Sequence, residues 1–181
     1  MDVYKQLEKE HSKENSLKIV SYIGNDFERF RELMDCFFAK TGDYRVPQRA
    51  AYTVSLSFDR QPELILPYRE KMIQALQNPE LKPGLKRNIL RVLQLTEIPE
   101  NLLGIVYKTV WGFLDNPKEE IAIRAFAMTV LYQISQKFPE LKTELHLLIL
   151  SVLEEAPPSP GIQSRGKHIL RKLDSKLAGF S

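Results

Sequence analysis

Proline spacing is the feature that most constrains how this chain can fold. Eleven prolines divide the 181 residues into segments of helical length. Proline lacks a backbone N–H and clashes inside a helix, so it is favoured in the first turn and at helix boundaries. Within the segments apolar residues recur three and four positions apart, as in 27–38, which is the spacing of one helix face. Alternating apolar and polar runs and Asn-Gly or Asp-Gly hairpin turns are absent. The sequence therefore predicts an all-α fold.

The expected helices lie between the prolines. A polar leader comes first and is followed by a helix at 16–24. Further helices are expected at 26–40, 45–60, 62–78, 82–96, 99–116, 118–138, 139–156 and 159–177.

Two features of these helices repeat along the chain. Three helices open on a Pro-Glu pair, and the intervals between Pro62, Pro99 and Pro139 are 37 and 40 residues. An arginine recurs in the intervening helices at intervals of 38, 37 and 41 residues, at Arg49, Arg87, Arg124 and Arg165. Both the Pro-Glu intervals and the arginine intervals indicate a repeat of about 40 residues, which is the length of a two-helix solenoid repeat.

The stretch 114–135 (LDNPKEEIAIRAFAMTVLYQIS) resembles the turn and second helix of a HEAT repeat. It has an Asp-Asn-Pro turn, acidic residues in the first helical turn, Ile-Arg-Ala, and a leucine six residues after Ala125. The stretch 46–58 is similar, whereas 85–95 and 162–173 are looser copies, the last with Gly166 where alanine is expected.

The chain thus resembles the HEAT-like and armadillo-type family of α-solenoids. This resemblance implies a right-handed α-α superhelix of about four stacked helix pairs with an N-terminal capping helix. A single repeat domain is expected over 1–181. Within it, 1–25 would form the leader and cap, and the pairs would span 26–60, 62–96, 99–138 and 139–177. Asp43 and Arg49 have the spacing of the Asp–Arg ladder found in many HEAT-like proteins.

Charge is unequally divided between the two sets of expected helices. The second helices of the pairs carry 15 lysines and arginines against 4 acidic residues, and the first helices carry 7 against 12. In HEAT-like solenoids the second helices tend to line the concave side, so the resemblance implies a basic concave face. The candidate binding residues on this face are Arg49, Lys86, Arg87, Arg91, Arg124, Arg165, Arg171 and Lys172.

Two other interpretations of these cations remain open. Solvated lysines and arginines can simply keep a surface soluble. The four arginines in the repeat register can instead bond carbonyls or carboxylates between helix layers, which leaves Lys86, Arg91, Arg171 and Lys172 as better surface candidates.

Three functions fit the basic face. The first is a non-catalytic scaffold that binds an acidic protein segment, and the second is nucleic-acid binding through phosphate contacts. The third is an alkylated-DNA glycosylase resembling the HEAT-like repair enzymes, in which Trp111 and Asp115 would act on one helix face. Asp115 also has a structural explanation, because it opens an Asp-Asn-Pro turn.

Other chemistry finds little support in the sequence. The histidines (His11, His146 and His168) lack metal-binding spacing, and Cys36 lies in an apolar stripe where it is expected to be a core residue. Phosphate-binding glycine motifs and the nucleophile elbow are absent. We therefore expect no catalytic residue, cofactor, metal or small-molecule substrate. With no apolar run long enough to span a bilayer, no signal-peptide pattern and one cysteine, a soluble cytoplasmic protein without membrane contact is expected.

Overall fold

The computed structural model describes residues 1–40, 44–155 and 159–177, with side chains up to residue 174. These residues form α-helices and two short 3-10 helices without any strand, which confirms the predicted all-α fold. The chain divides into two compact units, residues 1–92 and 93–181, and each is described by itself.

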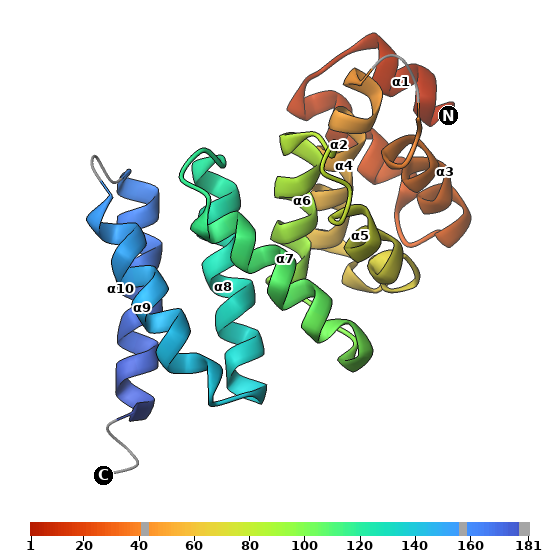
Figure 1. Ribbon diagram of the computed structural model, residues 1–181. Helices are drawn as coiled ribbons and strands as arrows, with labels where there is room; N and C mark the ends of the chain where they lie inside the picture. Colours follow the sequence, from red (N-terminus) through yellow and green to blue (C-terminus); the bar gives the residue numbers. More distant parts are fainter. Residues whose placement is uncertain (41–43, 156–158, 178–181) are drawn as a thin grey trace. The chain divides into compact units, whose positions relative to one another are not determined.

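The first unit is built around one long helix (Figure 1). Its elements are α1 (Val3–Lys9), α2 (Lys13–Ile23), α3 (Phe27–Phe37), α4 (Arg45–Arg60), the 3-10 helix η1 (Pro62–Tyr68), α5 (Arg69–Ala75) and α6 (Pro83–Leu93), which ends at the boundary with the second unit. Helix α4 packs against α1, α2, α3 and η1. Its buried surface includes small residues, Ala50, Ala51 and Ser55, which let the neighbouring helices approach closely. The apolar core of this unit therefore surrounds α4.

Residues 3–9, expected as part of the polar leader, form helix α1. Asp2 caps this helix, because its carboxylate accepts a hydrogen bond from the Lys5 amide at 3.0 Å. Val3 and Leu7 lie one helical turn apart and are both buried. The abundance of charged residues in the leader concealed this short apolar stripe.

The segment expected as one helix at 62–78 is instead a 3-10 helix followed by a short α-helix. Pro67 lies inside it and cannot donate the backbone hydrogen bond that an α-helix requires at that position. The α-helical part therefore begins only at Arg69.

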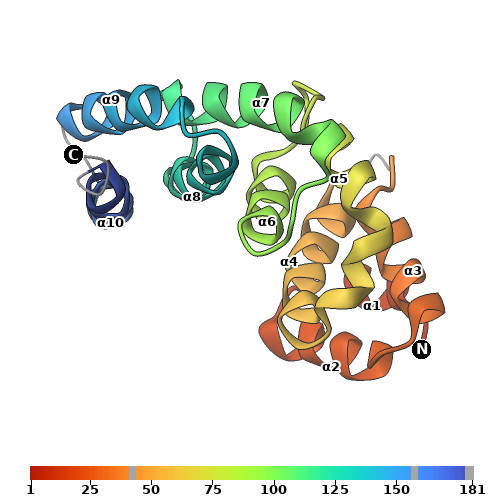
Figure 2. The same ribbon diagram turned by 90° about the horizontal axis from the view of Figure 1, so that it is seen from below.

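The second unit has two layers of helices (Figure 2). Its elements are η2 (Glu100–Leu102), α7 (Leu103–Asp115), α8 (Ile121–Lys137), α9 (Leu141–Glu154) and α10 (Pro160–Leu177). Helices α7 and α9 form one layer, and α8 and α10 form the other. Helix α8 packs against the other three, and its buried residues include Ile123, Ala127, Met128 and Leu131. The alternation between layers is the arrangement expected for stacked helix pairs.

Candidate functional site

Arg49 of α4 holds the end of helix α1. Its Nη1 atom donates hydrogen bonds to the carbonyl oxygens of Leu7 at 2.7 Å and Glu8 at 2.9 Å. These carbonyls belong to the last turn of α1, where no intrahelical donor is available. Asp43, the expected ladder partner of Arg49, lies outside the described residues. The contacts of Arg49 are thus with the backbone of a neighbouring helix.

Three of the predicted cations lie on α6. Arg91 connects this helix to α4, because its Nη2 lies 2.7 Å from a carboxylate oxygen of Asp59 and its Nη1 donates to the Ser55 carbonyl at 3.2 Å. Lys86 and Arg87 are half-buried on the same helix and also take part in contacts. Lys86, Arg87 and Arg91 thus lie on one helix of the first unit, where Arg91 is engaged with α4.

Arg124 of α8 is a buried structural residue with only 6% of its surface exposed. Its Nε donates to the Leu114 carbonyl at 2.9 Å, and its two terminal nitrogens bind both oxygens of Glu155 at 2.7 and 2.8 Å. The guanidinium hydrogen bonds lower the pKa of the Glu155 carboxyl, and burial opposes them only in part. Arg124 thus joins the ends of α7 and α9 to α8.

Arg165 of α10 makes a second polar connection in the same unit. Its Nη1 donates to the Thr129 hydroxyl at 2.5 Å and to the Gln94 side-chain oxygen at 3.3 Å. The side chain is half-buried. It therefore links α10, α8 and the segment that precedes α7.

Arg171 and Lys172, also on α10, are exposed. The Nε of Arg171 donates to the carbonyl of Lys167 within the same helix, at 3.3 Å. The Lys172 ammonium lies 5.6 Å from the centre of the Tyr132 ring on α8, within range of a cation–π contact. These two residues are the most accessible of the predicted set in the second unit.

The prediction missed two exposed residues next to them, Lys167 and His168. Because Lys167 and Arg171, like His168 and Lys172, are four residues apart, the four side chains occupy adjoining positions on α10. The only carboxylate of this helix, Asp174, binds Nε2 of His146 on α9 at 3.0 Å. The four-residue spacing of these side chains within the expected helix 159–177 could have identified them from the sequence. We call Lys167, His168, Arg171 and Lys172 the α10 basic patch.

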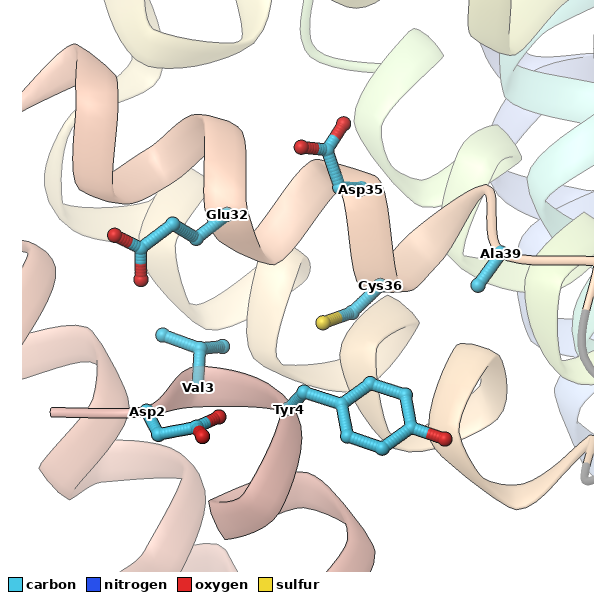
Figure 3. A pocket seen from close by; sticks show the side chains of 7 residues that line it. All are labelled: Asp2, Val3, Tyr4, Glu32, Asp35, Cys36 and Ala39. Carbon is cyan, nitrogen blue, oxygen red and sulfur yellow. The ribbon is translucent and has the colours of Figure 1, made fainter.

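A cavity of about 370 Å³ between α1 and α3 has the opposite charge (Figure 3). Three acidic residues, Asp2, Glu32 and Asp35, belong to its lining, and the thiol of Cys36 points into it beside the Tyr4 ring. Burial raises the pKa of Cys36 to about 11, and the neighbouring carboxylates add to this effect. A thiol with so high a pKa is a poor nucleophile at neutral pH, consistent with a core role.

Trp111 and Asp115, the residues considered for glycosylase chemistry, lie on α7, outside the layer formed by α8 and α10. Trp111 packs on Tyr107 with ring centres 5.5 Å apart, and Asp115 is the exposed last residue of the helix. The ring contact with Tyr107 accounts for the position of Trp111. The turn after α7 is formed by Asn116, whose side-chain oxygen accepts a hydrogen bond from the Lys118 amide at 3.0 Å.

The described residues contain no group of three or more His, Cys, Asp or Glu side chains arranged to hold a metal ion. Among them, no helix combines the length and apolar character needed to cross a membrane.

Comparison with known proteins gives one match. A family model described as a HEAT repeat domain matches residues 3–173. No curated protein and no solved structure matches the chain significantly. The family match covers nearly all the helices described above and confirms the resemblance seen in the sequence. The chain belongs to the HEAT repeat family.

Proposed function

We propose that this protein is a non-catalytic scaffold that binds an acidic protein segment through cations on its second helices. HEAT repeat domains typically serve as non-catalytic scaffolds for protein interaction. The partner and the surface are our proposal. The observation that carries it is the α10 basic patch, in which four basic side chains occupy adjoining exposed positions.

The predicted cations divide into two groups by their contacts. Arg49, Arg91, Arg124 and Arg165 donate to groups of their own unit, and we propose that they hold neighbouring helices in place. For partner binding we propose Lys86 and Arg87 in the first unit, and Arg171 and Lys172 with Lys167 in the second. These side chains are half-buried or exposed, so their charged ends can reach a partner.

Charge reversal tests the proposal directly. In the triple variant Lys167→Glu, Arg171→Glu, Lys172→Glu, we expect affinity for a fluorescent polyglutamate peptide to fall about tenfold or more, measured by anisotropy. Affinity for the same peptide should also fall as salt is raised.

A matched variant controls for the change in net charge. Lys9, Lys13 and Lys108 are exposed residues on α1, α2 and α7, and changing all three to glutamate alters the charge equally. This control should bind the peptide nearly as well as the unmodified protein, apart from a weaker long-range attraction. Equal losses in the two triple variants would refute a role for the α10 basic patch.

Nucleic-acid binding is the second candidate, because the same cations could contact phosphates. It predicts a shift of duplex DNA in a gel at low salt, weakened steeply at higher salt and lost in the α10 triple variant. DNA binding without polyglutamate binding would favour this candidate over the scaffold.

A further inference from the structure

A second cavity, of about 270 Å³, lies between helix α8 and the segment 95–98 in the second unit. Its lining includes the apolar side chains of Ile98, Leu103 and Ile134, which are almost fully buried. Leu95 also lines the cavity, and 62% of its surface is exposed. The cavity therefore combines an apolar lining with an accessible leucine.

One polar group in the lining lacks a partner. The side-chain nitrogen of Gln133 donates to the Gln94 carbonyl at 2.5 Å, which attaches the segment to α8. The side-chain oxygen of Gln133 is buried and accepts no hydrogen bond within the described part of the chain. Leaving a buried acceptor unpaired is unfavourable. A backbone N–H of a bound peptide, with a small rotation of the Gln133 amide, would supply the missing donor.

The charges around the cavity favour an acidic occupant. Lys137 and Glu97 line it and form an exposed ion pair with a separation of 3.2 Å, so a carboxylate from a partner can compete with Glu97 for Lys137. Arg165 donates to the side-chain oxygen of Gln94, the residue before Leu95, which brings a second cation beside this segment. The charged residues of the lining are one lysine and one glutamate, and Arg165 adds a positive charge beside them.

We propose that this cavity takes a leucine side chain of the acidic partner segment, with an acidic residue beside that leucine directed toward Lys137. Dry apolar cavities of about 150 Å³ can hold a molecule as large as benzene, so the volume is sufficient for a leucine. The inference rests on the proposed function and makes it more specific, since it defines the partner as an acidic segment with an apolar anchor.

Two peptides test this inference with the whole 181-residue chain. One has a leucine between two runs of glutamate, and the other has alanine in its place. Binding is followed by NMR of the isoleucine δ1 methyl groups, which include Ile98 and Ile134 in the cavity lining. We expect the leucine peptide to bind about tenfold more tightly and to shift both methyl resonances.

A pair of variants tests whether the preference arises in this cavity. Leu95→Ser removes the accessible leucine of the lining and should abolish the preference for the leucine peptide. Leu147→Ser changes a leucine on α9 that is equally accessible, with 61% exposed, and should retain it. Since both side chains are largely solvated, neither substitution should impair folding.

The outcomes separate the two proposals. If both peptides bind equally and the methyl resonances of Ile98 and Ile134 do not shift, the proposal that a leucine fills this cavity is refuted. The proposal of an acidic protein partner is then unaffected. If neither peptide binds, the proposed function fails and this inference fails with it. A preference for leucine that persists in Leu95→Ser would also overturn the assignment to this cavity.

Discussion

Replacing Arg124 by methionine should destabilise the second unit strongly. The substitution removes three hydrogen bonds: one to the Leu114 carbonyl and two to the Glu155 carboxylate. Removing one partner of a fully buried ion pair costs about 3–5 kcal/mol. Because 37% of the Glu155 side chain is exposed, water can solvate the remaining carboxylate. We therefore expect a smaller loss, about 2–3 kcal/mol in the free energy of unfolding.

Urea unfolding monitored by tryptophan fluorescence measures the loss in the free energy of unfolding of the second unit. Trp111 is the only tryptophan of the chain, and it lies on α7. Arg171→Met is the matched control, because Arg171 is exposed and, among the described side chains, its hydrogen bond is to a carbonyl of its own helix. The control should change stability by less than about 0.5 kcal/mol. Equal stability of the two variants would refute a structural role for Arg124.

The ion pair between Arg124 and Glu155 should also make the stability of the second unit depend on pH in acid. The pKa of Glu155 in the folded protein lies below its ordinary value of 4.5, because Arg124 stabilises the ionised form. The stabilisation is therefore complete above pH 4.5 and is lost as pH falls through the lower, folded-state pKa. In Glu155→Gln this part of the acid dependence should disappear. If the two proteins lose stability in parallel below pH 4.5, the ion pair makes no contribution.

Three further predictions concern other positions. Asn88→Ala should lower the free energy of unfolding by about 2 kcal/mol in urea titrations, because it removes a buried acceptor 2.6 Å from a serine hydroxyl. Ellman's reagent should label Cys36 at pH 8 at least about a hundredfold more slowly in the native than in the unfolded protein, since the thiol is buried and its pKa is about 11. Gly112→Ala should raise stability by about 0.5–1 kcal/mol, since beyond its chain neighbours and the backbone of its own helix the new methyl group meets no described atom within 4 Å. In contrast, Gly166→Ala should give no gain, because its methyl group would lie 2.9 Å from a methyl carbon of Leu153.

The helices were predictable because local features determine where they begin and end. Proline positions and apolar spacing placed α3, α4 and α7 to α10 within a few residues of their observed bounds. The errors arose where one local preference opposed another. Pro67 divided an expected helix into two parts, and two apolar residues were sufficient to fold the charged leader because α3 and α4 cover them.

The candidate site was less predictable, because the partners of a cation are set by tertiary contacts. Arg91 bonds to Asp59, which is 32 residues away, and Arg165 bonds to Gln94, which is 71 residues away. No pattern within one helix identifies such partners. The exposed positions of α10, by contrast, follow from spacing along that helix, and Lys167 could have been included on this basis.

The contacts of the recurring arginines explain why a regular Asp–Arg ladder is hard to find in this sequence. Among the described contacts, Arg49 binds two backbone carbonyls, Arg124 binds a carbonyl and a carboxylate, and Arg165 binds a hydroxyl and an amide oxygen. A guanidinium has five N–H donors and can satisfy any of these acceptors. Its position in the repeat can therefore be kept while the acceptor changes from one repeat to the next. Arg49, Arg124 and Arg165, which recur in the repeat, thus contribute to helix stacking, and the partner surface that we propose on α10 uses basic residues outside that repeat, such as Lys167 and Arg171.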